Sequence, residues 1–500
     1  MGQQRVIIIG AGPAGLTAAY QSLKHSLRPI VLETGDKVGG IARTEQHNGY
    51  RFDVGGHRFY TKIGQVQDLW REMLGQDFRK VPRLSRIYYR DRFFNYPLEI
   101  FNALFNLGIV PSFLILVSYV RWKIRPYRQE ETFEQWVTNR FGRRLYRTFF
   151  KTYTEKVWGI PCHEIRADWA AQRIRNLSLK TAIQNAIFGG SKAKSLINEF
   201  DYPILGPGQM WERFGAAIER GGGQVRLNTE VLQIKHDGMR VRSVITQNAG
   251  QRIEVEGAHF ISSMALVDLI HRLDPPPPPE VLAAAAKLNY RSFLIVGLVL
   301  DRPNLFPDNW VYVHGAEVKV GRIQNFGNWS AAMVPHPDKT SIGMEYFCNE
   351  GDALWSTPDD QLIRLATQEF GALRLAGGAT VEDGVVIRQP RAYPVYDSGY
   401  LAHLNVLQNY LRGFENLQTI GRNGMHRYNN QDHSMLTGLL AVKNLAGERH
   451  DLWNVNTERS YYEEFSTRRA EPSPERPVTE AVPVGPSESI PTAVSHPSGA

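Results

Sequence analysis

The feature that most constrains this fold is a glycine-rich turn between a short apolar strand and a helix. Residues 5–9 have the sequence RVIII, and Gly10-Ala11-Gly12-Pro13-Ala14-Gly15 follows at once. In a βαβ unit the first glycine permits the tight turn, the second lets the backbone approach a pyrophosphate, and the third lets the helix pack on the strand. The helix N-terminus adds N–H donors and positive potential. The motif therefore predicts a dinucleotide-binding Rossmann unit, against the alternative of a glycine-rich turn without a ligand.

The segment after the next expected strand favours FAD over NAD. The strand RPIVLE ends at Glu33, whose carboxylate is placed to accept hydrogen bonds from adenosine ribose hydroxyls. Gly39-Gly40 and Arg43 then provide a second flexible backbone segment and a guanidinium, which suit a diphosphate that reaches deep into the protein. A second GxGxxG motif is missing, so NAD(P)H is expected only as an external reductant. The expected cofactor-binding residues in this region are Gly10, Gly12, Pro13, Ala14, Gly15, Glu33, Thr34, Gly40, Ile41, Ala42 and Arg43.

Length, charge and cysteine content limit the class of protein. A chain of 500 residues is too long for one hydrophobic core, so two or three subdomains are expected. The formal net charge is +8, but the basic residues are scattered, which argues against a nucleic-acid partner and for an anionic substrate. Cys162 and Cys348 are the only cysteines and show no metal-ligand spacing. We therefore expect a cytoplasmic protein without a bound metal.

The order of helical and strand-like segments predicts an α/β protein. We expect a Rossmann-type FAD-binding domain with an inserted helical domain and a β-sheet substrate domain. The segments RSFLIVGLVL, NWVYVH and TSIGMEYF indicate the β-rich part, and the sequence after about residue 470 is too poor in apolar residues to fold. The expected boundaries are 1–61, 201–274 and 418–447 for the FAD-binding domain, 62–200 for a mostly helical insertion, 275–417 for the β-rich substrate domain, 448–469 for a C-terminal helix or extension, and 470–500 for a disordered tail.

One apolar stretch within the expected insertion raises the question of a membrane. Residues 101–120 have the sequence FNALFNLGIVPSFLILVSYV and are followed by the basic RWKIRPYR. The stretch is interrupted by Asn106, Gly108 and Pro111 and is barely long enough to span a bilayer. We expect a pair of helices that are buried in the insertion or packed on a partner, with docking on a membrane surface as the alternative. A monomer or a homodimer is expected.

Four separated sequence blocks resemble one protein family, and the resemblance covers most of residues 5–445. They are GGHRFYT at residues 55–61, Asn95-Tyr96-Pro97, YTEKVWG at residues 153–159, and the stretch from Gly421-Arg422 through Tyr428 to Asp432. In these blocks the chain resembles the UDP-galactopyranose mutases, flavoproteins related to amine oxidases, protoporphyrinogen oxidase and phytoene desaturase. Four blocks in the same order are hard to obtain by chance.

The chain also departs from the mutase pattern. Gly56 stands where the mutases have Pro, and Tyr60 stands where they have a second His. Their second diphosphate-binding Arg has no clear counterpart, which leaves Arg173 and Arg175 as candidates. The stretch GIPCHEIRADWAAQRI is more similar to protoporphyrinogen oxidases. We therefore expect a mutase-like branch that uses a different nucleotide or sugar, such as a GDP-linked hexose.

The resemblance implies roles for individual residues. His57 would lie beside the flavin ring, Arg322 would hold the substrate diphosphate, and the final helix would direct its N-terminus at the flavin pyrimidine. Ordinary core histidines or aromatics and a surface Arg are the alternatives. The implied catalytic residues are His57, Arg322 and Tyr428. The implied further cofactor contacts are Gly56, His57, Val231, Arg422, Asp432, His433 and Ser434. The implied substrate contacts are Asn95, Tyr153, Trp158, Arg173, Arg322, Tyr346, Tyr393 and Tyr428.

Two classes of reaction follow from the resemblance. In the favoured one, reduced flavin N5 attacks the anomeric carbon of a nucleotide-diphosphate hexopyranose, expels the nucleotide, and the sugar recloses as a furanose. In the alternative, the flavin oxidises an amine, porphyrin or polyene by hydride removal. A flavin-bearing scaffold without turnover is the third class. FAD is expected to be non-covalent, because no cysteine lies near the C-terminal flavin segment.

Overall fold

The structure is a computed structural model that describes residues 4–96, 98, 100–167 and 198–456. The expectations for Arg173, for Arg175 and for the tail at 470–500 concern residues outside this part. Of the expected C-terminal extension at 448–469, the described residues 448–456 contain a 3₁₀ turn, Leu452–Asn454.

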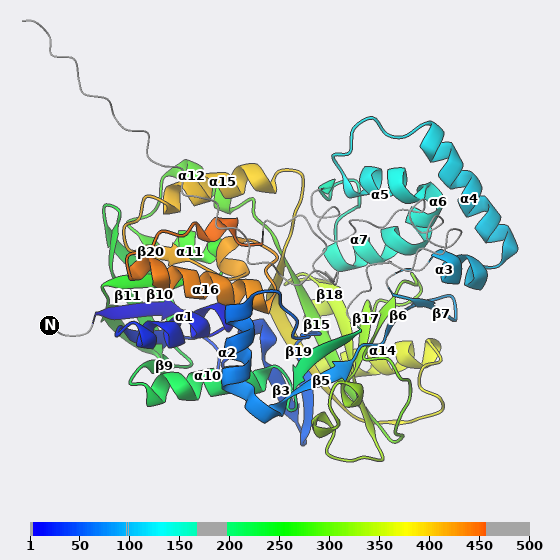
Figure 1. The fold of residues 1–500 in the computed structure, drawn as a ribbon, viewed down its shortest axis with the longest axis horizontal. Coiled ribbons are helices and arrows are strands. Elements are labelled where there is room, and N and C mark those ends of the chain that lie inside the picture. The colour runs from blue at the N-terminus through cyan, green and yellow to red at the C-terminus, as the bar shows by residue number, and fades with distance from the viewer. Residues whose placement is uncertain (1–3, 97, 99, 168–197, 457–500) are drawn as a thin grey trace, which may run out of the picture. The chain divides into compact units, whose positions relative to one another are not determined.

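The strand that precedes the glycine turn lies at the centre of a five-stranded sheet (Figure 1). Each pair of neighbouring strands in this sheet is parallel. The strand order is β20 (Leu417–Thr419), β13 (His259–Ser262), β1 (Arg5–Ile9), β2 (Arg28–Leu32), β9 (Gln224–Arg226). Successive side chains of a strand point to opposite faces, so Val6 and Ile8 pack into one core while Ile7 and Ile9 pack into another. A sheet covered on both faces explains the short, wholly apolar strands of the sequence.

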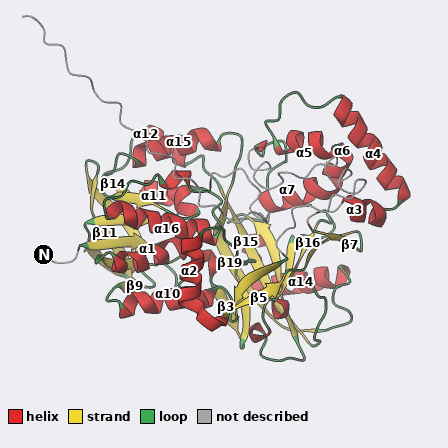
Figure 2. Ribbon diagram, viewed as in Figure 1, coloured by secondary structure: helices red, strands yellow, loops and turns green. Residues whose placement is uncertain are grey.

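Different layers cover the two faces of this sheet (Figure 2). The face of Val6 and Ile8 packs on helices α1 (Pro13–Lys24), α2 (Gly64–Leu74), α10 (Gly208–Arg220) and α16 (Gln431–Leu445). The face of Ile7 and Ile9 packs on a four-stranded sheet and three helices. These are β12 (Gln251–Glu256), β11 (Arg240–Asn248), β10 (Glu230–Asp237), β14 (Leu273–Asp274), α11 (Leu266–Arg272), α12 (Pro279–Ala285) and α15 (Tyr400–Leu411). The expected boundaries at 275 and 417 therefore need correction, because α12 and α15 bury their apolar faces against the nucleotide-binding sheet.

The largest sheet of the described residues has seven strands, two from residues 85–95 and five from residues 290–394. Its order is β19 (Val381–Pro394), β15 (Tyr290–Leu300), β18 (Thr340–Cys348), β17 (Arg322–Asn325), β16 (Trp310–Val313), β6 (Ser85–Tyr89), β7 (Arg92–Asn95). All pairs are antiparallel except β16 with β6. The helix α14 (Asp359–Ala372) packs on it through Leu362, Ala366 and Phe370.

The insertion expected at 62–200 also contains short strands beside its helices. β6 and β7 form a hairpin whose turn residues, Arg90 and Asp91, have φ of 51° and 57°, as a two-residue hairpin loop requires. Its aromatic residues suit a half-buried pleated surface. A second pair joins β5 (Phe78–Pro82) to β8 (Glu199–Pro203). Before the insertion, β3 (Thr44–His47) pairs with β4 (Tyr50–Asp53).

Helices group together in the rest of the insertion (Figure 1). They are α3 (Ile100–Leu107), α4 (Ile109–Ile124), α5 (Phe133–Phe141), α6 (Arg143–Leu145), a π-helix at Tyr146–Lys151 and α7 (Thr152–Trp158). The apolar stretch forms α3 and α4 and breaks at Gly108. Burial within the insertion, one of the two expected placements, does not hold for α4, because only Ile115 of this helix is buried; packing on a partner stays a prediction. Among the described helices, none combines the length and the apolar character needed to cross a bilayer.

Candidate functional site

The glycine turn forms a cradle with room for a phosphate. Gly10 has φ of +99°, and a Cβ on Gly15 would lie 1.9 Å from the carbonyl oxygen of Gly10. Gly12 precedes the first turn of α1, which no side chain of the described residues caps. Across from it, a Cβ on Gly40 would lie 3.2 Å from Gly12 Cα. The free helix N-terminus and the two bare backbones fit the pyrophosphate of a dinucleotide.

Two charged side chains brace this cradle. The Glu33 carboxylate accepts hydrogen bonds from the backbone N–H groups of Ala11, at 2.7 Å, and Gly35, at 2.9 Å. Arg43 donates to the Gly40 carbonyl, at 3.0 Å, and to Gln389 Oε1 on β19, at 2.6 Å. Arg43 thus connects the cradle to the seven-stranded sheet. The other expected cofactor residues are Pro13 and Ala14 in the first turn of α1, Thr34 after β2, Ile41 and Ala42 in the 3₁₀ turn Gly40–Ala42, and Val231, buried on β10.

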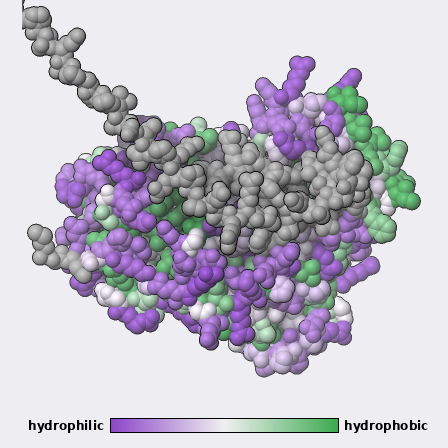
Figure 3. All heavy atoms as spheres, in the orientation of Figure 1, coloured by the Kyte–Doolittle hydropathy of each residue, from purple (hydrophilic) through white to green (hydrophobic). Residues whose placement is uncertain are grey.

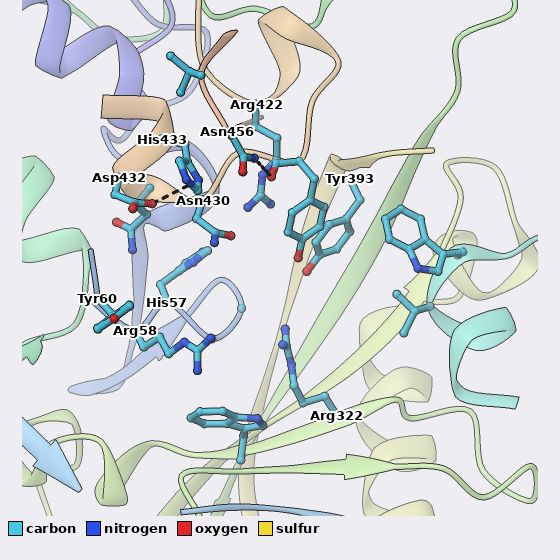
Figure 4. A pocket seen from close by; sticks show the side chains of 18 of the residues that line it. His57, Arg58, Tyr60, Arg322, Tyr393, Arg422, Asn430, Asp432, His433 and Asn456 are labelled. Carbon is cyan, nitrogen blue, oxygen red and sulfur yellow. Dashed lines mark hydrogen bonds and ion pairs between the residues drawn. The ribbon is translucent and has the colours of Figure 1, made fainter. Parts of the chain in front are cut away.

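A cavity of about 930 Å³ is walled by the loop at 55–58, the seven-stranded sheet, α7 and the start of α16 (Figure 4). This is the size of a cavity that holds a large ligand. It brings together most of the expected site residues. They are Gly56, His57, Tyr153, Trp158, Arg322, Tyr393, Arg422, Tyr428, Asp432 and His433.

His57 is a neutral side chain between two cations. Its Nε2 lies 2.6 Å from the Ile41 carbonyl oxygen and 3.2 Å from that of Val54, so Nε2 carries the proton that it donates to them. Burial, together with the positive charges of Arg422 and Arg322, lowers the pKa of His57 to about 3. The imidazole is therefore uncharged at neutral pH and leaves Nδ1 as an acceptor.

Arg322 reaches into the cavity from the start of β17, toward His57 and Tyr393 (Figure 4). Its Nε and Nη2 donate to Glu345 Oε2 on β18, at 2.9 and 2.5 Å. Glu345 is fully buried and also accepts from Gln324 Nε2 at 2.6 Å. The carboxylate fixes the guanidinium and raises the pKa of Arg322 further. No hydrogen bond or ion pair of Nη1 is seen within the described residues, so this group can donate to a ligand.

Aromatic rings and a second cation form the opposite wall. The rings of Tyr393 and Tyr428 stack at 5.6 Å with an interplanar angle of 12°. The Arg422 guanidinium lies 4.7 Å from the Tyr428 centroid and 5.5 Å from that of Tyr393. Trp158 lies 6.3 Å from Tyr428. Such a wall offers flat faces with polar tips beside a positive charge, which suits planar and anionic ligand groups.

The N-terminus of α16 closes a third side. Asp432 Oδ2 accepts a hydrogen bond from the Thr61 hydroxyl at 2.9 Å, and its Oδ1 lies 3.6 Å from His433 Nδ1. The backbone N–H of Ser434 is used within the helix, where it donates to the Asn430 carbonyl at 2.9 Å. A helix N-terminus favours the ionised carboxylate, but burial outweighs it here and raises the pKa of Asp432 to about 7.

Lys156 holds helix α7 to the loop between β16 and β17 at one edge of the cavity. Its Nζ donates to the carbonyl oxygens of Gly315, Val318 and Val320 at 2.8, 3.0 and 3.0 Å. These carbonyls belong to the loop between β16 and β17. Burial lowers the pKa of Lys156 to about 8.

Two expected substrate contacts, Tyr346 and Asn95, do not line the cavity. Tyr346 follows Glu345 on β18, so alternation turns it to the opposite face, where it is buried in the core against α14. Asn95 does not line the cavity; its backbone N–H donates to Asn102 Oδ1 at 2.9 Å, and the next residue, Tyr96, lines the wall instead. Arg173 lies outside the described residues.

Several residues of the cavity wall are not among those expected from the sequence. His314 stacks on Tyr153 at 4.6 Å with an interplanar angle of 13°, and burial with the charge of Lys156 lowers its pKa to about 3. Trp310 and Tyr312 line the same wall. Their alternation in NWVYVH is the signal that places these three side chains on one face of a strand. Asn454 and Asn456 also line the cavity from a segment without a recognisable pattern.

Known proteins similar to this chain show which family it belongs to. Residues 13–391 match the family model of flavin-containing amine oxidoreductases. The chain belongs to this family. A crystal structure of reduced UDP-galactopyranose mutase has the same fold, with a TM-score of 0.80 and 22% identity over 92% of this chain and 100% of that chain. Putrescine oxidase bound to putrescine matches with a TM-score of 0.56 and 17% identity over 89% of this chain and 99% of that chain.

Curated relatives match over shorter segments. A Klebsiella pneumoniae protein named "Probable UDP-galactopyranose mutase" is 25% identical over 177 residues, which are 33% of this chain and 44% of that protein. The mitochondrial protoporphyrinogen oxidase of Nicotiana tabacum is 38% identical over 63 residues, 13% of this chain and 12% of that protein. Over the first curated relatives the match spans between 9% and 51% of their own length.

Family membership makes this chain a flavoprotein, and the cradle fits FAD. The bare backbones at Gly12 and Gly40 fit its diphosphate, and the cavity at His57 and the start of α16 has room for a ring system. The residues that would hold the cofactor are therefore those of the glycine turn and the 55–57 loop.

Gly12→Val should give a folded protein without flavin. A Cβ at position 12 meets only Gly40 Cα, at 3.9 Å, in the fold itself, yet the valine side chain would fill the space that a pyrophosphate needs. The flavin-to-protein absorbance ratio and the melting temperature test this. Gly371→Ala, in a helix with nothing within 4 Å, is the control that should stay yellow. Flavin retained by Gly12→Val would contradict the cradle.

Asp432→Asn should change how the stability of the flavin-free protein depends on pH. Because the folded-state pKa of about 7 lies above the ordinary value of 3.8, the folded protein keeps a proton that the unfolded chain releases. Stability then falls as pH rises from about 4 to 7, by on the order of a few kcal/mol, and this loss is absent in the variant. Melting temperatures measured from pH 4 to 8 test it, with the exposed Glu256→Gln as control. Parallel curves for parent and Asp432→Asn would contradict it.

Proposed function

We propose that this chain is a flavin-dependent mutase that interconverts the pyranose and furanose forms of a nucleotide-diphosphate hexose, with a UDP-galactose-like or a GDP-linked sugar as substrate. The observation that carries the proposal is Arg322, held by a buried carboxylate and directed into an aromatic cavity beside the flavin-facing loop. A fixed guanidinium among stacking rings is what recognition of a sugar-nucleotide diphosphate needs. The shared fold with UDP-galactopyranose mutase supports it.

Reduced, non-covalent FAD would supply the electron pair that displaces the diphosphate from the anomeric carbon, and would recover it on ring closure. The chain's own residues then have separable tasks. Arg322 holds the diphosphate through Nη1 while Glu345 keeps its remaining nitrogens in place. The neutral His57 borders the reacting region without adding a third positive charge.

Two further features suit this chemistry. Arg422 and the N-terminus of α16 place positive potential beside the flavin-facing side of the cavity, which favours a reduced, electron-rich ring. The stacked pair Tyr393 and Tyr428, and the pair Tyr153 and His314, offer faces to a sugar or base. External NAD(P)H is the proposed source of the electrons that reduce the enzyme.

An oxidoreductase that removes hydride from an apolar substrate is the second candidate. The cavity also has apolar side chains in its wall, among them Leu98, Phe149 and Phe347. Putrescine oxidase shares the fold, and the family is named for amine oxidoreductases. The two candidates demand opposite flavin redox states, so one experiment separates them.

Arg322→Ala should weaken nucleotide-sugar binding at least about tenfold, because loss of a buried charged contact costs about 2 to 5 kcal/mol. Titration of UDP-, GDP- and dTDP-hexoses against the flavin spectrum measures it. The control is Arg86→Ala, which removes a matched bidentate partner from the fully buried Asp308, with contacts of 2.8 and 2.6 Å. Both variants should lose stability, but only Arg322→Ala should lose affinity. Equal affinity in the two variants would remove Arg322 from the site.

The redox state should decide activity. Anaerobic, dithionite-reduced enzyme should interconvert the pyranose and furanose forms of its nucleotide sugar over many turnovers. Air-oxidised enzyme should not, because only the reduced flavin ring has an N5 electron pair available for attack on the anomeric carbon. Chromatography of the sugar products tests this, with flavin-free Gly12→Val inactive in both states. The mutase proposal fails if oxidised enzyme consumes an amine, porphyrin or polyene catalytically while reduced enzyme leaves every nucleotide hexose unchanged.

A further inference from the structure

Helix α4 carries a continuous row of exposed apolar side chains, here called the apolar ridge. Ile109, Phe113, Val120 and Ile124 are 89%, 63%, 55% and 72% exposed. Their spacing of four, seven and four residues keeps them on one side of the helix. The other members of the ridge on α4 are Val110, Leu116 and Val117, and Phe105, near the end of the preceding helix α3, extends it. Figure 3 shows a hydrophobic strip over this part of the helical insertion, along its outer edge.

The opposite side of α4 is anchored, so the helix cannot rotate to bury the ridge. Ile115 is 2% exposed and belongs to the core of the insertion. The Ser118 hydroxyl accepts a hydrogen bond from the backbone N–H of Arg144 at 3.1 Å. A Cβ on Gly142 would lie 2.9 Å from Tyr119 Cα, which shows how closely the next turn approaches the helix. Outward exposure is thus a fixed property of this surface, and it exceeds the scattered apolar residues of an ordinary surface.

The charged residues within the sequence of α4 and the segment that follows it, up to residue 128, are all basic. Arg121, Lys123, Arg125 and Arg128 lie at the C-terminal end of the ridge and directly after it, and they are exposed. No acidic residue occurs in the sequence between Glu99 and Glu130. Trp122 and Tyr127 pack at 4.8 Å within the same basic segment. Aliphatic side chains, then aromatic rings and cations form the sequence of an interfacial membrane helix.

We propose that the apolar ridge and the basic segment at 121–128 dock this protein on the surface of an anionic lipid bilayer. Helix α4 has 16 residues, about 24 Å of helix, and would lie in the plane of the headgroups with the ridge at the acyl boundary. The cations would pair with lipid phosphates. The inference is independent of the proposed mutase reaction.

The charges on α4 argue against a second copy of the chain as the partner that covers the apolar ridge. In an antiparallel pairing the basic end of one α4 meets the N-terminal end of the other, which has the positive end of the helix dipole and no acidic side chain. In a parallel pairing the basic ends meet each other. An anionic lipid surface satisfies both the apolar residues and the cations.

Sedimentation of the flavin-loaded full chain with lipid vesicles tests the proposal. Binding to phosphatidylcholine vesicles that contain phosphatidylglycerol should exceed binding to pure phosphatidylcholine vesicles at least about tenfold and should fall with added salt. Phe113→Ser with Val117→Ser, and separately Arg121→Glu with Lys123→Glu, should each lose most of the binding. The matched controls Ile253→Ser and Arg252→Glu lie exposed on β12 and should bind as the parent does.

Two results would overturn the inference. One is a parent protein that stays in the supernatant with anionic vesicles. The other is a parent that light scattering shows to be a dimer and that Phe113→Ser with Val117→Ser converts to monomers, since the ridge is then an interface between copies. Flavin content and melting temperature check that each variant is folded; if the apolar variant does not fold, the charge-reversal variant decides.

Discussion

Two bare backbones face each other at Gly12 and Gly40, and the arrangement of the site depends on that approach. The first lies at the start of α1, and the second begins the 3₁₀ turn that leads into β3 and β4. The carbonyl of Ile41, in the same turn, receives the hydrogen bond of His57. A side chain at either glycine would therefore displace more than a phosphate, because the turn that completes the cradle also orients a side chain of the cavity.

A second constraint is electrostatic and lies inside the seven-stranded sheet. Glu345 is fully buried, and Arg322 and Gln324 together satisfy its oxygens. A buried ion pair is weak evidence for stability, because desolvation offsets most of the attraction between the charges. Its value here is positional: a long, flexible side chain is held in one orientation at the edge of a cavity. The same carboxylate lowers the net positive charge of the site, so affinity for an anion depends on how the guanidinium is oriented as well as on its charge.

The sequence was most informative where one local pattern determines the structure. RVIII, the glycine turn and Glu33 predicted the βαβ unit, and β15, β16 and β18 lie where apolar runs indicated strands. It was least informative where a distant partner decides. SRIYY forms β6 because β16 lies beside it, and α15 leaves the substrate sheet because its apolar face is buried on the other core. Tyr346 illustrates the limit for side chains: a shift of one residue along β18 separates the site from the core, and nothing local fixes that register. Asn454 and Asn456 line the cavity because the chain after α16 returns to it, and no local sequence pattern predicts that return.

The ammonium of Lys156 has a mechanical consequence. It joins a helix of the insertion to the Val313 carbonyl at the end of β16 and to three carbonyls of the loop between β16 and β17, and that loop carries His314 at one end and leads to Arg322 at the other. Breaking all four contacts at once would leave a buried charge without partners, so the helix and the loop are expected to move as one stiff unit. A tilt of α7 would then move Tyr153 and His314 together, whereas Arg322 would stay with Glu345 in the sheet, so the width of the cavity between them would change.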